Sequence, residues 1–128
     1  MIYKALVLRV DDDIEEEVRI RIGDIELACF AGVCPYNIEA GLSYPVELRP
    51  VVFGDYSVTE LLDGTPASID RVGTGFAYII TGRLSGSCLE SVELVIEDDV
   101  LQRDFGYLEG KIIAMKIDRM DVEFLSVQ

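Results

Sequence analysis

The chain of 128 residues contains no histidine. Histidine is the side chain that most often moves protons near neutral pH, and it activates the nucleophile in Ser-His-Asp and Cys-His sites. Its absence excludes these arrangements within one chain and removes histidine as a metal ligand. Carboxylates, tyrosine, lysine and cysteine remain as catalytic groups, so an enzyme is not excluded. We nevertheless favour a protein without catalytic residues.

Basic residues are scarce. Eleven Lys and Arg stand against 24 Asp and Glu, which gives a net charge of −13 and a pI near 4.2. Such a surface repels phosphate backbones and anionic lipids, so we expect neither nucleic-acid nor membrane binding. No stretch approaches the ~20 apolar residues that span a bilayer. The charge favours solubility and attracts basic proteins.

Cysteine is also sparse and odd in number: Cys29, Cys34 and Cys88. Three cysteines do not form a closed disulfide framework, and the first two lack the C-x-x-C spacing of a redox pair. A zinc site normally needs four ligands, so we predict no metal and no cofactor. Lys4 and Arg9 interrupt the first apolar run, which is unlike a signal peptide. We therefore expect a cytoplasmic location.

The segment VRIRIGDIELACF, residues 18–30, predicts a β-hairpin. A two-residue Gly23-Asp24 turn places Ile22 opposite Ile25 and Ile20 opposite Leu27 on one face. Glycine at the first turn position suits a type II′ turn. Cys29 then continues the buried face opposite Val18, which predicts a small core residue.

Similar alternation recurs along the chain. We predict strands within residues 3–10, 44–49, 76–81, 91–97 and 111–125, with a short one near 68–72. Ser57–Glu60 fits either a capped helical turn or an edge strand. Around residues 118–121, Arg119 flanked by two aspartates is expected to form a local ion-pair network that pins a bend or bulge.

Many short strands and few helix signals predict an all-β protein with at most one short helix. We expect a single domain over residues 1–128, built as a small, partly open β-barrel of the OB type, with a β-sandwich as the alternative. Closure into a barrel is the best way to hide sheet edges in a small chain.

The acidic run DDDIEEE, residues 11–17, is the one strongly charged segment. It lacks the ligand spacing and the glycine of a calcium loop, so a solvated loop is its simplest interpretation. The functional alternative is a patch that docks a basic partner. The residues of that predicted patch are Asp11, Asp12, Asp13, Glu15, Glu16 and Glu17.

These features favour a non-enzymatic protein-interaction module, with an inhibitor or immunity-type role as one form of it. The alternative is a small-molecule-binding protein or enzyme whose barrel pocket is lined by tyrosine and carboxylates. Binding of single-stranded nucleic acid on exposed aromatics is a third hypothesis, which the charge disfavours. A homo-oligomer that pairs through a sheet edge is compatible with the pattern.

Overall fold

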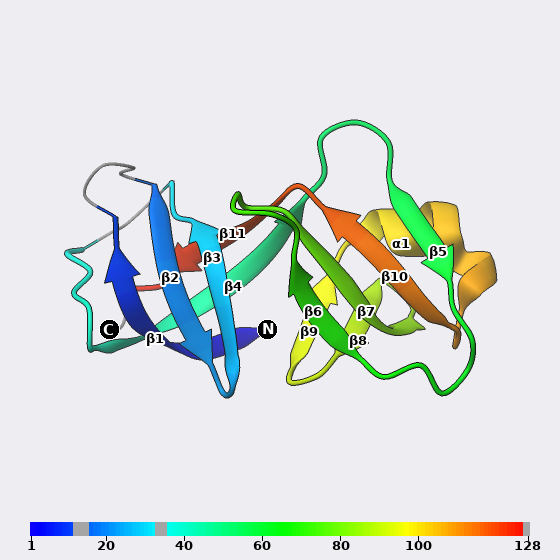
Figure 1. Cartoon of the computed structure of the whole chain (residues 1–128), viewed down its shortest axis with the longest axis horizontal. Coiled ribbons are helices and arrows are strands. Elements are labelled where there is room, and N and C mark those ends of the chain that lie inside the picture. The colour runs from blue at the N-terminus through cyan, green and yellow to red at the C-terminus, as the bar shows by residue number, and fades with distance from the viewer. Residues whose placement is uncertain (12–15, 33–35, 127–128) are drawn as a thin grey trace.

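The computed structural model describes residues 1–11, 16–32 and 36–126. Within them the chain is mostly strand, with one α-helix of seven residues and one 3-10 helix of three. The predicted all-β class with at most one short helix is confirmed. The strands form a closed barrel, on the left in Figure 1, and a second sheet on the right.

The barrel joins the two ends of the chain. Its strand order is β1-β2-β3-β11-β4, and β1 pairs with β4 to close the ring. Neighbouring strands are antiparallel, except that β3 and β11 run parallel and meet at Phe30 and Asp121. The barrel is thus closed rather than partly open. Its strands are β1 (Ile2–Val10), β2 (Glu17–Ile22), β3 (Ile25–Phe30), β4 (Ser43–Val51) and β11 (Arg119–Phe124).

The second sheet is inserted between β4 and β11 of the barrel. Its strand order is β5-β10-β7-β8-β9. Strand β6 pairs with the first half of β7 and β8 pairs with the second half, along the same edge of β7. Its elements are β5 (Ser57–Glu60), β6 (Ser68–Arg71), β7 (Tyr78–Ser85), β8 (Cys88–Ser91), β9 (Leu94–Glu97), α1 (Asp99–Phe105), the 3-10 helix (Gly106–Leu108) and β10 (Ile112–Ile117).

One apolar cluster connects the barrel with the second sheet. It runs from Ile20 and Phe124 in the barrel to Ile80, Ile113 and Leu101 in the sheet and its helix. Burial of such surface is the main stabilising contribution in folding. A single domain over residues 1–128 stays a prediction, because a shared core does not by itself make two sheets unfold together.

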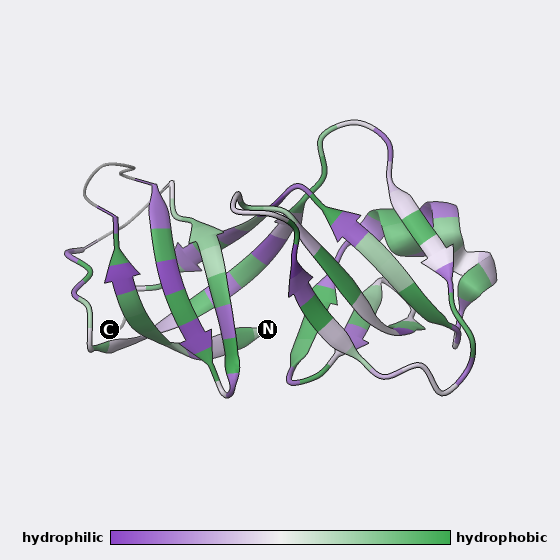
Figure 2. Cartoon of the chain, viewed as in Figure 1, coloured by the Kyte–Doolittle hydropathy of each residue, from purple (hydrophilic) through white to green (hydrophobic). Residues whose placement is uncertain are grey.

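The predicted hairpin is confirmed in detail. Ile22 pairs with Ile25, Ile20 with Leu27, and Val18 with Cys29. Figure 2 shows the alternation of apolar and polar residues along β2. Gly23 has a φ of 59°, whereas Asp24 is not one of the described residues with a positive φ. A type II′ turn requires this combination.

The prediction of one strand over residues 91–97 is wrong. Ser91 pairs with Leu94, so Val92 and Glu93 form a two-residue turn between β8 and β9. Val92 takes φ 54°, a conformation that β-branched residues rarely adopt. Because valine favours strands, the sequence pattern indicated one continuous strand and did not indicate the turn.

Two local predictions concerned helix. Ser57–Glu60 forms strand β5, paired with β10, so the edge-strand interpretation is the correct one. The helix lies instead at Asp99–Phe105, where the side chain of Asp98 accepts a hydrogen bond from the Val100 amide. An aspartate N-cap, an acidic first turn and a basic last turn are the sequence signals that would have found it.

Candidate functional site

The predicted acidic patch is only partly covered by the structure. Asp12, Asp13 and Glu15 lie outside the described residues, whereas Asp11, Glu16 and Glu17 are described. The carboxylate of Asp11 is 3.7 Å from the guanidinium of Arg9, and that of Glu17 is 4.0 Å from Arg71. Two of its acids therefore lie beside arginines. The docking role of this patch stays a prediction.

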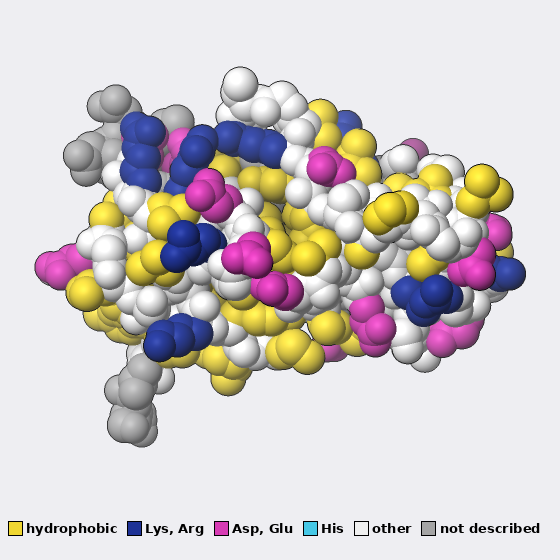
Figure 3. Space-filling view, turned by 60° about the horizontal axis from the view of Figure 1, so that its bottom comes forward, with side chains coloured by type: hydrophobic (Ala, Val, Ile, Leu, Met, Phe, Trp, Pro, Cys, Tyr) yellow, Lys and Arg dark blue, Asp and Glu magenta, His cyan; other side chains and the backbone are white. Residues whose placement is uncertain are grey.

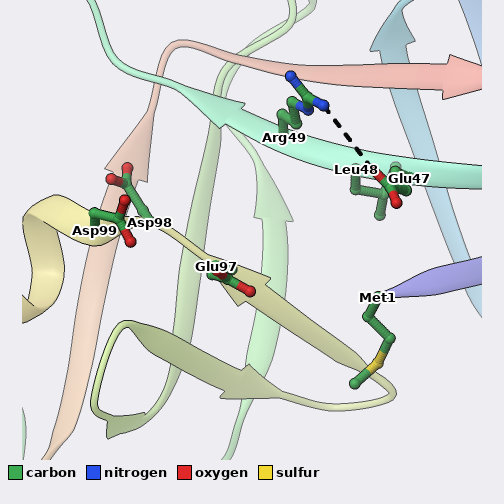
Figure 4. Close-up of a pocket in the computed structure, with 7 residues that line it drawn as sticks. All are labelled: Met1, Glu47, Leu48, Arg49, Glu97, Asp98 and Asp99. Atoms are coloured by element: carbon green, nitrogen blue, oxygen red, sulfur yellow. Dashed lines mark ion pairs between the residues drawn. The ribbon is translucent and has the colours of Figure 1, made fainter.

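A groove between β4 and the β9–α1 junction brings together carboxylates that are distant in sequence. We call it the acidic groove, and its volume is about 500 Å³. Figure 4 shows Glu47 and Arg49 along β4, with Glu97 at the end of β9 and Asp98 and Asp99 at the start of α1. Its lining residues are Met1, Glu47, Leu48, Arg49, Glu97, Asp98 and Asp99.

Asp98 is held in place by two hydrogen bonds. One carboxylate oxygen accepts from the Val100 amide at 3.1 Å, and the other accepts from the Tyr56 hydroxyl at 2.5 Å. Burial has the largest effect on the pKa of Tyr56 and the hydrogen bond to Asp98 the next largest, and they raise this pKa to about 12. Tyr56 therefore stays protonated near neutral pH and orients the carboxylate at the wall of the groove.

Arg49 offsets only part of the negative charge. Its guanidinium lies 3.1 Å from Glu123, outside the groove lining, and 3.9 Å from Glu47. Glu97 and Asp99 are exposed, and no ion pair to another described residue involves either of them. The groove thus presents four carboxylates against one guanidinium, with two carboxylates available to a ligand.

Sequence reasoning missed this groove. Glu47 and Glu97 are fifty positions apart, and each looks like an ordinary outward residue of a strand. Only Asp98-Asp99, as an N-cap and first-turn pair, carried a local signal. The packing that brings β4 near β9 is set by tertiary structure.

The cysteines do not form a site among the described residues. Cys29 is fully buried, as predicted, and burial together with the nearby Asp121 raises the pKa of its thiol. Cys88 is half-buried and free, and Cys34 lies outside the described residues. Within residues 1–11, 16–32 and 36–126, no three Cys, Asp or Glu side chains are grouped to hold a metal ion.

Of the ion-pair network predicted around Arg119, the described residues form only the pair with Asp121. The guanidinium of Arg119 donates to both carboxylate oxygens of Asp121, at 2.6 and 3.1 Å, and lies 4.1 Å from the ring centre of Phe30. Asp118 instead accepts from the Phe53 amide at 2.6 Å. These contacts are structural, and the carboxylate of Asp121 is already occupied.

The inside of the barrel is filled with side chains. Inward-facing residues of its strands are buried, and the grooves described here lie outside the ring. These buried residues are Ala5, Val7, Val18, Ile20, Ile22, Leu27, Cys29, Val46, Met120, Val122 and Phe124.

Comparisons with known proteins identify a family and nothing closer. A family model described as "Uncharacterised conserved protein UCP019853" matches residues 1–125. No curated protein and no solved structure matches the chain. Among the described residues, no helix is long and apolar enough to cross a membrane.

Proposed function

The chain belongs to this family of uncharacterised conserved proteins, and we propose that it is a non-enzymatic interaction module that binds a basic segment of a partner protein in the acidic groove. The observation that carries the proposal is the gathering of Glu47, Glu97, Asp98 and Asp99 around one cavity. The net charge of −13 would attract the same partner over a longer range.

The groove suits a lysine or arginine side chain. Met1 and Leu48 line it beside the carboxylates, so the aliphatic stem of a basic residue has apolar surface to cover. Glu97 and Asp99 are the carboxylates open to its charged end. Asp98 is less available, because Val100 and Tyr56 already occupy its oxygens.

The role that we propose for such binding is inhibitory or immunity-type. Proteins that act on nucleic acids carry basic sites for phosphate. A carboxylate-lined groove on an acidic protein imitates that charge and would compete for the basic site. We place this activity in the cytoplasm, with no nucleic acid bound by the chain itself.

Two finer structural proposals accompany this function. The barrel is of the OB type, which its five strands, its closure and the parallel pair β3 and β11 support. Self-association, where it occurs, would use the outer strands β5 and β9, which end the described order of the second sheet.

An enzyme or small-molecule-binding protein with a pocket inside the barrel is the competing hypothesis. The filled barrel interior gives it no support. The experiment that tests the acidic groove also has an outcome that would favour a site inside the barrel.

The test uses a hexalysine peptide as a basic probe, titrated into the full chain and followed by calorimetry and amide NMR. We expect the double variant Glu97→Gln/Asp99→Asn to weaken binding by about tenfold at low salt, because it removes the two open carboxylates. The matched control is Asp70→Asn/Glu90→Gln, which removes the same charge from exposed residues outside the groove. It should weaken binding less than about threefold.

Equal losses in the two variants would mean that only net charge attracts the peptide, and the proposal would fail. Amide shifts confined to the inside of the barrel would instead favour the competing hypothesis. Insensitivity to salt would remove the electrostatic basis of the proposal.

A further inference from the structure

A second groove separates β2 and β3 of the barrel from β6 and β7 of the second sheet. We call it the arginine groove, and its volume is about 200 Å³. Figure 3 shows Lys and Arg side chains gathered in a row over the barrel on this face. The groove is lined by Arg19, Glu26, Leu27, Ala28, Ile69, Arg71 and Tyr78.

Arg19 is half-buried and unusually placed. It lies directly opposite Arg9 in the pairing of β1 and β2, and like charges in such positions destabilise a sheet. Arg9 has a carboxylate partner in Asp11. Arg19 has no ion pair with any other described residue. A partly desolvated guanidinium without a partner is costly, and an anion at this position would relieve that cost.

Arg71 is oriented toward the same groove by its own hairpin. Its guanidinium donates to the carbonyl oxygens of Gly75 and Thr74, at 2.8 and 2.6 Å. Its nearest carboxylate is that of Glu17, 4.0 Å away. A guanidinium has five N–H donors, so these bonds hold the side chain in place and leave donors for a ligand.

Tyr78 supplies a third donor. Its side chain lines the groove although the residue is only 3 % exposed. Its hydroxyl oxygen accepts from the Ala28 amide at 2.7 Å, so the hydroxyl proton remains to be donated. Burial raises the pKa of Tyr78, and this effect outweighs the Ala28 bond and the charges of Arg71 and Arg19, which lower it. The phenol is therefore protonated at neutral pH.

We propose that the arginine groove binds a carboxylate group, with the guanidiniums of Arg19 and Arg71 and the hydroxyl of Tyr78 as donors. The carboxylate belongs to a small organic acid or to the free C-terminus of a peptide. Its two oxygens accept several hydrogen bonds, and a guanidinium binds them in a paired geometry.

Charge and size select this class of ligand. Glu26 lines the groove and Glu17 borders it, so their two negative charges formally offset those of the two arginines, and a ligand with several negative charges is repelled more than one with a single charge. A volume of about 200 Å³ holds roughly six or seven water molecules, which is too small for a nucleotide. The net charge of −13 also repels polyanions.

The experiment is an NMR titration of the full chain with three probes: acetate, N-acetyl-trialanine, and the C-terminal amide of that peptide. We expect saturable shifts of the Arg19 and Arg71 side-chain Nε–Hε signals and of the Ala28 amide. Binding by acetate identifies a small acid as the ligand, and binding by the free-acid peptide alone identifies a C-terminus. The amide should produce no shift.

The variants separate a site from general attraction. Arg19→Gln should weaken binding by about tenfold, because it removes a guanidinium that has no ion pair among the described residues. Arg21→Gln is the control, since Arg21 lies on the same strand but is exposed and does not line the groove. Tyr78→Phe, which keeps the ring, should weaken binding severalfold.

Several results would overturn the proposal. If chloride at the same ionic strength produced equal shifts, the shifts would reflect ionic screening and not the binding of a carboxylate. Equal affinity of Arg19→Gln and the unmodified chain would remove the arginine from the site. Phosphate binding more tightly than both carboxylate probes would assign a different class of ligand, and binding of the amide as tightly as the acid would exclude the carboxylate.

Discussion

The β2–β3 hairpin of the barrel and the β8–β9 hairpin of the second sheet each have a two-residue turn, and different residues take a positive φ at its first position. In the barrel, Gly23 takes φ 59°, and in the second sheet, Val92 takes φ 54°. The two turns also touch, because the Asp24 amide donates to the Glu93 carboxylate at 3.2 Å. The glycine allowed the β2–β3 turn to be predicted from the sequence. The valine indicated a continuous strand, so the β8–β9 turn was not predicted.

The barrel and the second sheet also differ in how their edge strands are paired or covered. The barrel closes on itself through the pairing of β1 with β4. The second sheet leaves β5 and β9 as outer strands within the described order, and α1 contributes Leu101 to its core. Closure removes unpaired backbone groups, while an open sheet has to cover or shorten its edges.

The largest effect is expected from Phe124→Ala in the barrel. Phe124 is 2 % exposed and belongs to β11, which lies between β3 and β4 in the ring. Losing a buried phenylalanine should lower the free energy of unfolding by about 4 kcal/mol. Urea denaturation followed by circular dichroism measures this loss.

The matched change is Leu101→Ala, in the helix α1 that follows β9 of the second sheet. Native-state hydrogen exchange on both variants tests the prediction of a single domain. If the two sheets unfold together, each variant speeds exchange in both. Exchange that accelerates only in the altered sheet would show two independent units.

A smaller effect is expected from Gly82→Ala in β7. A Cβ atom at Gly82 would lie 2.1 Å from the carbonyl oxygen of Glu90 on β8, so the two strands would have to separate. We expect a loss of about 2–3 kcal/mol in thermal or urea unfolding. Gly75→Ala is the control, because its added Cβ meets nothing within 4 Å, and a similar loss there would contradict the close approach of β7 and β8.

The smallest effect is expected from Val92→Gly, which gives the second hairpin the turn residue of the first. It relieves a left-handed valine but adds freedom to the unfolded chain, so the net gain should be about 0.5–1 kcal/mol. A rise in the unfolding midpoint would measure it. A loss of stability would mean that Val92 contributes contacts that outweigh its backbone strain.

Prediction from sequence succeeded where the information is local. The β2–β3 hairpin, its register, the buried Cys29 and the ion pair of Arg119 with Asp121 each depend on residues a few positions apart. It did not find the acidic groove, whose acids come from β4 and from the β9–α1 junction. It did not find the arginine groove either, because Arg19, Arg71 and Tyr78 belong to three strands in two sheets.

The sequence by itself determined the all-β class, the faces of the strands and the negative charge, because a period of two and a count of charges require no knowledge of distant residues. Tertiary structure alone decided that β11 lies between β3 and β4 in the barrel and that the second sheet is inserted before it. It also decided which side chains line each groove. Such pairings join residues as distant as Tyr3 and Val95, whose hydrogen bond spans 92 positions. They form because burying both sheets in one core outweighs the entropy of closing so long a loop.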